Sequence, residues 1–175
     1  NWLRNRAAQK TPEKTPSGGF SDTELGRYAR HIVLREIGGP GQKRLKKARV
    51  LVIGAGGLGA PVLQYLAAAG VGTIGVIDDD TVENGNLQRQ VIHRDGDIGM
   101  PKVFSAKAAM QAQNPFVDVR PYNRRLNAEI SAELFAEYDL VVDGTDNFDT
   151  RYLVNETSVA LGKPLISGAL SQWEG

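Results

Sequence analysis

A glycine-rich loop follows directly after a short apolar run near position 50. The run is Val50–Ile53, and the loop reads Gly54-Ala55-Gly56-Gly57-Leu58-Gly59. Glycine suits such a loop, because a Cβ would block the tight turn and keep backbone N–H groups away from a phosphate. A helix predicted over 61–69 would add the positive end of its dipole. The spacing therefore predicts a strand, a phosphate loop and a helix, and the loop glycines are Gly54, Gly56, Gly57 and Gly59.

A carboxylate, Asp78, stands at the end of a second apolar run. Thr73–Ile77 predicts a buried strand, and a carboxylate at its carboxyl end, about 20 residues past the loop, accepts hydrogen bonds from ribose hydroxyls. Asp79 and Asp80 follow at once. Period-two alternation favours Asp78 over Asp79, which points to the other face, while Asp80 suits a cap for the next segment. The loop and Asp78 fit NAD as well as ATP.

Two cations and a further carboxylate favour ATP. Arg89 and Lys102 can neutralise a triphosphate, which develops charge on its oxygens and on pyrophosphate when the α-phosphorus is attacked. Asp146 follows the apolar run Leu140–Val142, so it emerges at the same carboxyl edge of the sheet and can hold Mg²⁺. Asp143 is either a second magnesium neighbour or the cap of the following turn. The set indicates ATP-dependent activation of a carboxylate.

Strands and helices alternate along the chain. Besides the strands above, runs at 117–122, 140–143 and 164–167 predict strands, and helices are expected over 101–113, 127–137 and 148–161. Ser21 and Glu24 have the spacing of a capping box, which opens an N-terminal helix, and Arg44 to Ala48 leads into the first strand. The pattern predicts an α/β fold with a doubly wound, Rossmann-like, mainly parallel sheet and an N-terminal helical segment.

The first 20 residues predict a flexible basic tail, and residues 21–175 one ATP-binding domain. Thr11-Pro12, Thr15-Pro16 and Gly18-Gly19 mark the tail as a linker. An upstream membrane tether is an alternative to an ordinary tail, because Trp2 with its basic neighbours resembles the cytoplasmic flank of a membrane segment. The uncharged stretch Leu51–Ile77 is not expected to span a bilayer, since its seven glycines fit a strand-loop-helix-strand unit.

Composition sets further limits. The chain has 175 residues, of which 41% are hydrophobic, enough for one substantial core. Because 21 basic side chains face 20 acidic ones, nucleic acid is not expected as a partner. The sequence contains no cysteine, which fits a reducing, cytoplasmic setting and excludes a thiol nucleophile or a thiolate zinc site within it. His31 and His93 are isolated, so we expect structural roles for both.

Taken together, the motifs resemble the ThiF/MoeB superfamily of adenylyltransferases, bacterial relatives of the ubiquitin-activating enzymes. The similarity runs from about Ser21 to Gly175, and the motifs that carry it are Arg27–Leu34, Gly54–Gly59, Asn86–Gln90, Pro101-Lys102 and Gly144–Asn147. The stretch Ile166–Ala169, with Glu174-Gly175, is more similar to the molybdopterin-synthase branch (MoeB) than to the thiamine branch (ThiF). Both pathways stay open as expectations.

The resemblance implies a role for each matching residue. In the family the glycine loop binds the ATP phosphates, and the position of Asp78 binds ribose. The positions of Arg89 and Lys102 contact the triphosphate, that of Asn86 lines the phosphate pocket, and that of Asp146 serves Mg²⁺.

The resemblance also implies partners. The position of Arg30 reaches into the site of a second subunit, which implies a homodimer. The substrate implied is the C-terminal Gly-Gly carboxylate of a ubiquitin-like sulfur carrier, MoaD-like or ThiS-like, converted to an acyl-adenylate with release of pyrophosphate. Family members carry paired C-x-x-C zinc motifs, so we expect zinc only outside this sequence, in a longer protein of which the chain is an incomplete part at both ends.

Two function classes remain as alternatives. An NAD-dependent oxidoreductase shares the loop and Asp78, but it leaves Arg89, Lys102 and Asp146 without a role. A non-catalytic scaffold would use the fold to dimerise and hold a ubiquitin-like protein. The three intact polar residues weigh against a scaffold.

Overall fold

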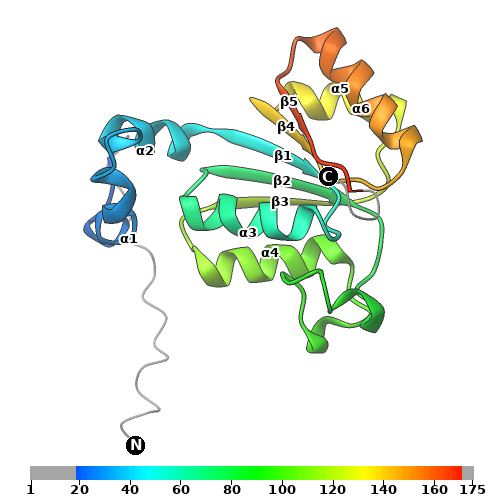
Figure 1. The fold of residues 1–175 in the computed structure, drawn as a ribbon, viewed down its shortest axis with the longest axis horizontal. Helices are drawn as coiled ribbons and strands as arrows, with labels where there is room; N and C mark the ends of the chain where they lie inside the picture. Colours follow the sequence, from blue (N-terminus) through cyan, green and yellow to red (C-terminus); the bar gives the residue numbers. More distant parts are fainter. Residues whose placement is uncertain (1–18, 171–175) are drawn as a thin grey trace, which may run out of the picture.

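The computed structural model describes residues 19–170, which form a five-stranded sheet with helices on both faces (Figure 1). Its strands are β1 (Arg49–Ile53), β2 (Thr73–Asp78), β3 (Asp118–Asn123), β4 (Leu140–Asp143) and β5 (Leu165–Ser167). Their spatial order is β3-β2-β1-β4-β5, and each neighbouring pair is parallel. The predicted doubly wound, Rossmann-like sheet is confirmed.

Two pairs of helices cover the sheet. The α-helices are α1 (Asp22–Ile32), α2 (Gly38–Lys47), α3 (Gly59–Ala69), α4 (Lys102–Gln113), α5 (Ala128–Ala136) and α6 (Phe148–Leu161). Two short 3-10 helices, η2 (Asn84–Asn86) and η3 (Asp95–Asp97), lie between β2 and α4. Helices α3 and α4 pack together on one face, and α5 and α6 on the other (Figure 1).

Alternate residues of β1 belong to opposite layers of the core. Val50 and Val52 join the apolar cluster that contains side chains of α3 and α4. Leu51 and Ile53 join the cluster that contains side chains of α5 and α6. A strand buried on both faces has no polar side, which explains why its sequence is an unbroken apolar run.

The order of the strands creates a crevice. From β1 the chain winds through α3, β2 and α4 to β3, and then α5 returns it to β4 on the other side of β1. The loops after β1 and β4 therefore leave the carboxyl edge of the sheet in opposite directions. In doubly wound folds a ligand binds at this switch point.

Helix α1 is fixed at the opposite, amino edge of the sheet. Its capping box is formed as predicted, with the Glu24 N–H 3.2 Å from Ser21 Oγ and the Ser21 N–H 2.9 Å from the Glu24 carboxylate. The Tyr28 hydroxyl accepts from Asn114 Nδ2 at 2.8 Å, and the Tyr28 ring lies where a side chain on Gly70 would be. Because Gly70 and Asn114 end α3 and α4, α1 contacts the C-terminal ends of both helices.

A buried ion pair joins α1 to α2. Glu24 is 1% exposed and lies 2.6 Å from the Lys46 ammonium. Burial alone would raise the pKa of this carboxyl, but Lys46 and the Ser21 N–H outweigh burial and hold the pKa below its ordinary value. Lys46 also donates to Gly19 O at 2.9 Å, so the described end of the predicted tail contacts the domain. The basic side chains of that tail lie outside the described residues.

The observed helices differ from the sequence expectation at their starts. Helix α2 begins at Gly38, whereas the sequence indicated only its last turns, because Gly38, Gly39 and Gly41 are poor helix formers. Pro40 is tolerated there, since the first turn of a helix requires no N–H from it. Helix α3 begins at Gly59 rather than at Pro61. None of the helices within residues 19–170 is both long and apolar enough to cross a lipid bilayer.

Candidate functional site

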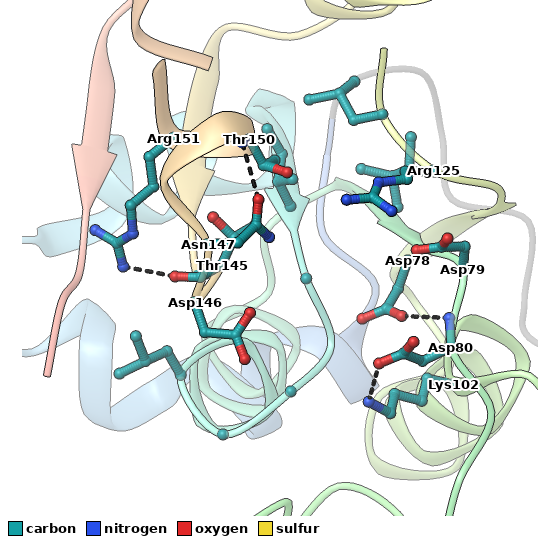
Figure 2. Close-up of a pocket in the computed structure, with 18 of the residues that line it drawn as sticks. Asp78, Asp79, Asp80, Lys102, Arg125, Thr145, Asp146, Asn147, Thr150 and Arg151 are labelled. Carbon is teal, nitrogen blue, oxygen red and sulfur yellow. Dashed lines mark hydrogen bonds and ion pairs between the residues drawn. The ribbon is translucent and has the colours of Figure 1, made fainter. Parts of the chain in front are cut away.

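A cavity of about 1030 Å³ opens at the carboxyl edge of the sheet. The loops that follow β1, β2, β3 and β4 all contribute to its walls (Figure 2). The predicted site residues that line it are Gly54, Gly56, Gly57, Asp78, Asn86, Arg89, Lys102 and Asp146. Residues separated by up to 92 positions (146 minus 54) therefore meet at one place. The two predicted residues absent from the lining are Gly59 and Arg30.

The glycine loop wraps closely onto the start of α3. Gly54 has φ +91°, a left-handed conformation that favours glycine, and its N–H donates to Ile77 O at 2.9 Å. A Cβ on Gly59 would lie 1.9 Å from Gly54 O, so Gly59 serves the packing of the loop against the helix. Gly56 and Gly57 line the cavity, and the side chains of Gln90 and Arg89 lie 3.7 Å and 3.6 Å from the points where their Cβ atoms would be. The loop can thus present backbone N–H groups at a helix N-terminus.

Asp78 supports the loop as well as lining the cavity. Its Oδ2 accepts from the Ala55 N–H at 2.7 Å, and its Oδ1 accepts from the Asp80 N–H at 2.8 Å. Burial raises the pKa of the Asp78 carboxyl above its ordinary value, although these two donors oppose the rise. Each carboxylate oxygen retains a second lone pair that can accept from a sugar hydroxyl. Asp79 and Asp80 are exposed and follow on the same side of the cavity (Figure 2).

The two predicted cations reach the cavity from different elements. Lys102, at the start of α4, has a side chain only 7% exposed, and its ammonium lies 2.7 Å from Asp80 Oδ2. The exposed Arg89 follows η2; its guanidinium donates to Gly85 O at 3.2 Å, and its Cδ lies 3.6 Å from the point where a Cβ on Gly57 would be. Both positive charges are therefore held beside the glycine loop.

Two carboxylates near the end of β4 have different surroundings. Asp143 is 2% exposed; its Oδ1 accepts from the Thr145 N–H and hydroxyl, and its Oδ2 from the Ser167 hydroxyl. Asp143 thus caps the turn, the second of the two roles that the sequence allowed. Asp146 is exposed and lies on the side of the cavity opposite Asp78 and Lys102 (Figure 2). No side-chain hydrogen bond or ion pair joins Asp146 to the rest of residues 19–170.

Asp146 is better suited to a divalent cation than the neighbouring acidic cluster. Asp78, Asp79 and Asp80 bring one oxygen each within 4.8 Å of one another. However, Asp78 already accepts two backbone hydrogen bonds, and Asp80 is paired with Lys102. The unpaired carboxylate of Asp146 faces the open cavity and fits the oxygen chemistry that Mg²⁺ requires.

Some of the cavity wall was not evident from the sequence. Arg124 and Arg125 come from the loop after β3, and Arg151 from α6. Arg151 Nη2 donates to Thr145 O and Gly168 O, so it ties together two segments of the cavity wall. These arginines lie outside the recognisable motifs, and a single sequence holds no other signal that separates them from surface arginines.

The two histidines have structural surroundings, as expected. His93 is buried; its Nε2 lies 3.0 Å from Ala55 O and its Nδ1 2.8 Å from Ser105 Oγ. Burial lowers the pKa of His93. Because a carbonyl oxygen can only accept, His93 Nε2 donates to Ala55 O of the glycine loop. His31 Nδ1 lies 3.0 Å from Gln42 Oε1, between α1 and α2.

The chain is similar in sequence to a known protein family and to curated proteins. Residues 28–175 match the model of the ThiF family. The "Probable adenylyltransferase/sulfurtransferase MoeZ" of Mycobacterium tuberculosis is 54% identical over 164 residues, which make up 94% of this chain and 42% of that protein. The "Sulfur carrier protein adenylyltransferase" of Thermus thermophilus is 55% identical over 156 residues, 89% of this chain and 58% of that protein. The chain thus spans about half the length of the curated relatives it matches.

A solved structure has the same fold. The crystal structure of the E. coli tRNA N6-threonylcarbamoyladenosine dehydratase TcdA, in complex with ATP, superposes with a TM-score of 0.82 at 24% sequence identity. The match covers 88% of this chain and 64% of TcdA.

Proposed function

The chain belongs to the ThiF family, and from that premise we propose that it uses ATP and Mg²⁺ to adenylate the C-terminal carboxylate of a ubiquitin-like sulfur-carrier protein. The single observation that carries the proposal is the composition of the cavity. A glycine loop at a helix N-terminus, two cations and an unpaired carboxylate meet at the switch point of the sheet. The Thermus relative, 55% identical, is named for the same reaction on the same class of partner.

Each cavity residue has a role that follows from its position. The N–H groups at Gly56 and Gly57 face the phosphates, and Asp78 accepts from the ribose hydroxyls. Asn86 and Arg89 lie along the phosphate side, where the guanidinium offers a planar set of donors.

The Lys102 ammonium has three donors, so it can contact a phosphate from its position beside Asp80. In the free protein its ammonium is held by Asp80, whose side chain is 67% exposed. Asp80 thereby keeps Lys102 directed toward the cavity before nucleotide binds.

The chemistry calls for positioning and charge neutralisation. Bound ATP supplies an electrophilic α-phosphorus, and the carrier carboxylate is already ionised near neutral pH. Arg89 and Lys102 neutralise the charge that develops on the phosphoryl oxygens and the departing pyrophosphate. Neither a protein nucleophile nor a general base is required, which agrees with the structural surroundings of His93.

Asp146 would hold the magnesium ion. Bound Mg²⁺ would supply positive charge that offsets the negative charge of the phosphates. Asp146 faces the cavity from the end of β4, on the side opposite Lys102 (Figure 2), and its carboxylate oxygens would hold the ion there.

We assign the carrier to the molybdopterin pathway within this class. The support is the sequence Ile166–Ala169 at and after β5, which is more similar to the MoeB branch than to the ThiF branch. Activation of a thiamine-pathway carrier is the second candidate. A carrier of each class, offered to the same enzyme, distinguishes the two.

The proposed active unit is a homodimer that shares Arg30. In the described chain Arg30 is exposed on α1, at the amino edge of the sheet, while the cavity opens at the carboxyl edge. Helix α3, of 11 residues and therefore about 16 Å long, separates the two ends. Arg30 can serve a cavity of the same kind only in a neighbouring subunit.

The test is ATP–pyrophosphate exchange by the full-length protein. Exchange should require Mg²⁺ and a small carrier protein that ends in Gly-Gly, because the acyl-adenylate forms reversibly and the carrier provides the carboxylate. A carrier that lacks the two glycines is the matched control and should give background exchange. Equal exchange without carrier, or with free amino acids, would contradict the proposal. Tight binding of NADH without binding of ATP would favour the oxidoreductase alternative.

A further inference from the structure

A buried histidine holds one carbonyl of the glycine loop from behind the cavity. His93 lies between η2 and η3, is 6% exposed and does not line the cavity. Its Nε2 donates to Ala55 O at 3.0 Å. On the other side of the ring, Ser105 Oγ lies 2.8 Å from His93 Nδ1 and 2.7 Å from Asp97 Oδ2. The ring is therefore fixed at both of its nitrogens.

Three peptide groups at the start of the loop are held by the backbone or by Asp78. The N–H of Gly54 donates to a carbonyl of β2 at 2.9 Å, and the N–H of Ala55 donates to Asp78 Oδ2 at 2.7 Å. The carbonyl of Gly56 accepts from the Ala60 N–H at 2.8 Å. These bonds fix the peptide groups 53–54, 54–55 and 56–57, and none of them involves His93.

The peptide group between Ala55 and Gly56 is held by His93 instead. Within the part of the chain that the structure describes, no other hydrogen bond uses the Ala55 carbonyl, and none uses the Gly56 N–H. In a trans peptide the C=O and N–H point in opposite directions, so a carbonyl that faces His93 turns the Gly56 N–H away from the buried ring. Gly56 lines the cavity, and its N–H is free for a ligand there.

We propose that His93 is a positioning residue that, through the Ala55 carbonyl, keeps the Gly56 N–H directed into the cavity. The inference rests on the proposed ATP-dependent adenylation. Without His93 this peptide group could rotate at little cost, because Gly56 tolerates a positive φ. A rotated group would present the Ala55 oxygen to the phosphates in place of an N–H, and a carbonyl dipole in that direction repels an anion. His93 opposes the rotation without contacting the nucleotide.

Two substitutions of His93 separate the functions of the two ring nitrogens. In His93→Gln the amide nitrogen can occupy the place of Nε2 and still donate to Ala55 O. The shorter side chain of His93→Asn reaches only the place of Nδ1, so it can contact Ser105 but not Ala55. Affinity for ATP should fall about tenfold in His93→Asn, as expected for one hydrogen bond to a charged group, and should stay within about threefold in His93→Gln.

Adenosine, which has no phosphate, is the reference ligand. Partial unfolding lowers the apparent affinities for ATP and adenosine by the same factor, so the ratio of the two affinities is independent of the folded fraction. This ratio should fall about tenfold in His93→Asn and stay within about threefold of the wild type in His93→Gln. Titration calorimetry on the full-length protein measures both affinities.

Ser105→Ala tests the support of the ring without changing His93. The ring loses the contact that fixes Nδ1, so the ratio of ATP to adenosine affinity should fall about threefold, less than in His93→Asn. Ser131→Ala is the matched control. Ser131 is also a buried serine on a helix, but it pairs with Thr157 between α5 and α6 and lies outside the cavity lining, so the ratio should be unchanged.

The outcomes distinguish positioning from a purely structural role. An unchanged ratio in His93→Asn, or the same fall in His93→Asn and His93→Gln, would overturn the inference. Equal losses of ATP and adenosine binding in His93→Asn would make His93 a structural residue and would also overturn it. If His93→Asn does not fold, Ser105→Ala decides, and an unchanged ratio there refutes the positioning role. A wild-type protein that binds no ATP would instead contradict the proposed function itself.

Discussion

Asp143 and Asp146 are three positions apart, and their different surroundings give the two carboxylates different roles. Asp143 is buried, and both its oxygens accept hydrogen bonds from Thr145 and Ser167. Asp146 is exposed at the cavity and has no such partner within the described residues. A carboxylate whose oxygens accept hydrogen bonds stabilises a turn, whereas a carboxylate without such partners leaves its oxygens available to a ligand. The sequence named both as candidates, and the hydrogen bonds distinguish them.

Asp146→Asn is expected to abolish exchange without affecting the fold. The amide keeps the shape of the side chain but removes the negative charge, so Mg²⁺-dependent exchange should fall about 100-fold or more. The free energy of unfolding should change by less than about 0.5 kcal/mol, because the side chain is exposed. Asp149→Asn is the control, since Asp149 is exposed in the first turn of α6 and lies outside the cavity lining. Near-normal turnover of Asp146→Asn at saturating Mg²⁺ would assign the metal to another residue.

The residues that the sequence identified are those with a motif around them. Asp78, Arg89, Lys102 and Asp146 each follow a recognisable strand or loop, and all four line one cavity. Arg151 escaped notice because its role is to join the loops at 145 and 168, a contact that depends on how β4 and β5 are placed in space. The pairing of Lys102 with Asp80 was likewise hidden, because the two residues are 22 positions apart.

At the scale of elements, the pattern of apolar residues in the sequence predicted the buried strands of the sheet. The unbroken apolar runs became parallel strands, since helices cover both faces of the sheet. The capping box of α1 and the approximate ends of the strands were also predicted, because they depend on neighbours within a few positions. The start of α2 was not predicted; three glycines and Pro40 disfavour a helix locally, and contacts of α2 with α1 stabilise it.

The glycines of the phosphate loop should differ sharply in their tolerance of a methyl group. In Gly59→Ala the new Cβ would lie 1.9 Å from a backbone oxygen of Gly54, so the loop must shift, and we expect a loss of roughly 3 kcal/mol or more in unfolding free energy. In Gly57→Ala the nearest atoms are 3.6 Å away in the flexible Arg89 side chain, and stability should change by less than about 1 kcal/mol.

The two variants should also lose affinity for ATP for different reasons. Gly57→Ala should be folded but should bind ATP weakly, because its Cβ projects from a residue that lines the cavity. Urea denaturation and ATP titration, measured on the same samples, separate the two effects. A stable Gly59→Ala protein would show that α3 can move away from Gly54, and the packing role of Gly59 would then be wrong.

At the scale of the whole molecule, the two edges of the sheet at the strand ends carry different features. The carboxyl edge carries the cavity, and the amino edge carries α1, which is fixed by Tyr28 on Gly70 and Asn114 (Figure 1). The exposed face of α1 presents Arg30 away from the cavity of its own chain. We propose that Arg30 acts on catalysis through a second copy of the chain, arranged about a two-fold axis.

Mixing two inactive variants tests this arrangement. Arg30→Ala and Arg89→Ala should each be inactive alone, because every site in either homodimer lacks one arginine. After subunit exchange, half of the dimers are heterodimers, and each holds one site with Arg89 from one subunit and Arg30 from the other. The mixture should therefore regain about one quarter of wild-type exchange activity. If exchange of subunits is verified by tagged copies and no activity returns, Arg30 acts within its own chain or not at all, and the shared site is refuted.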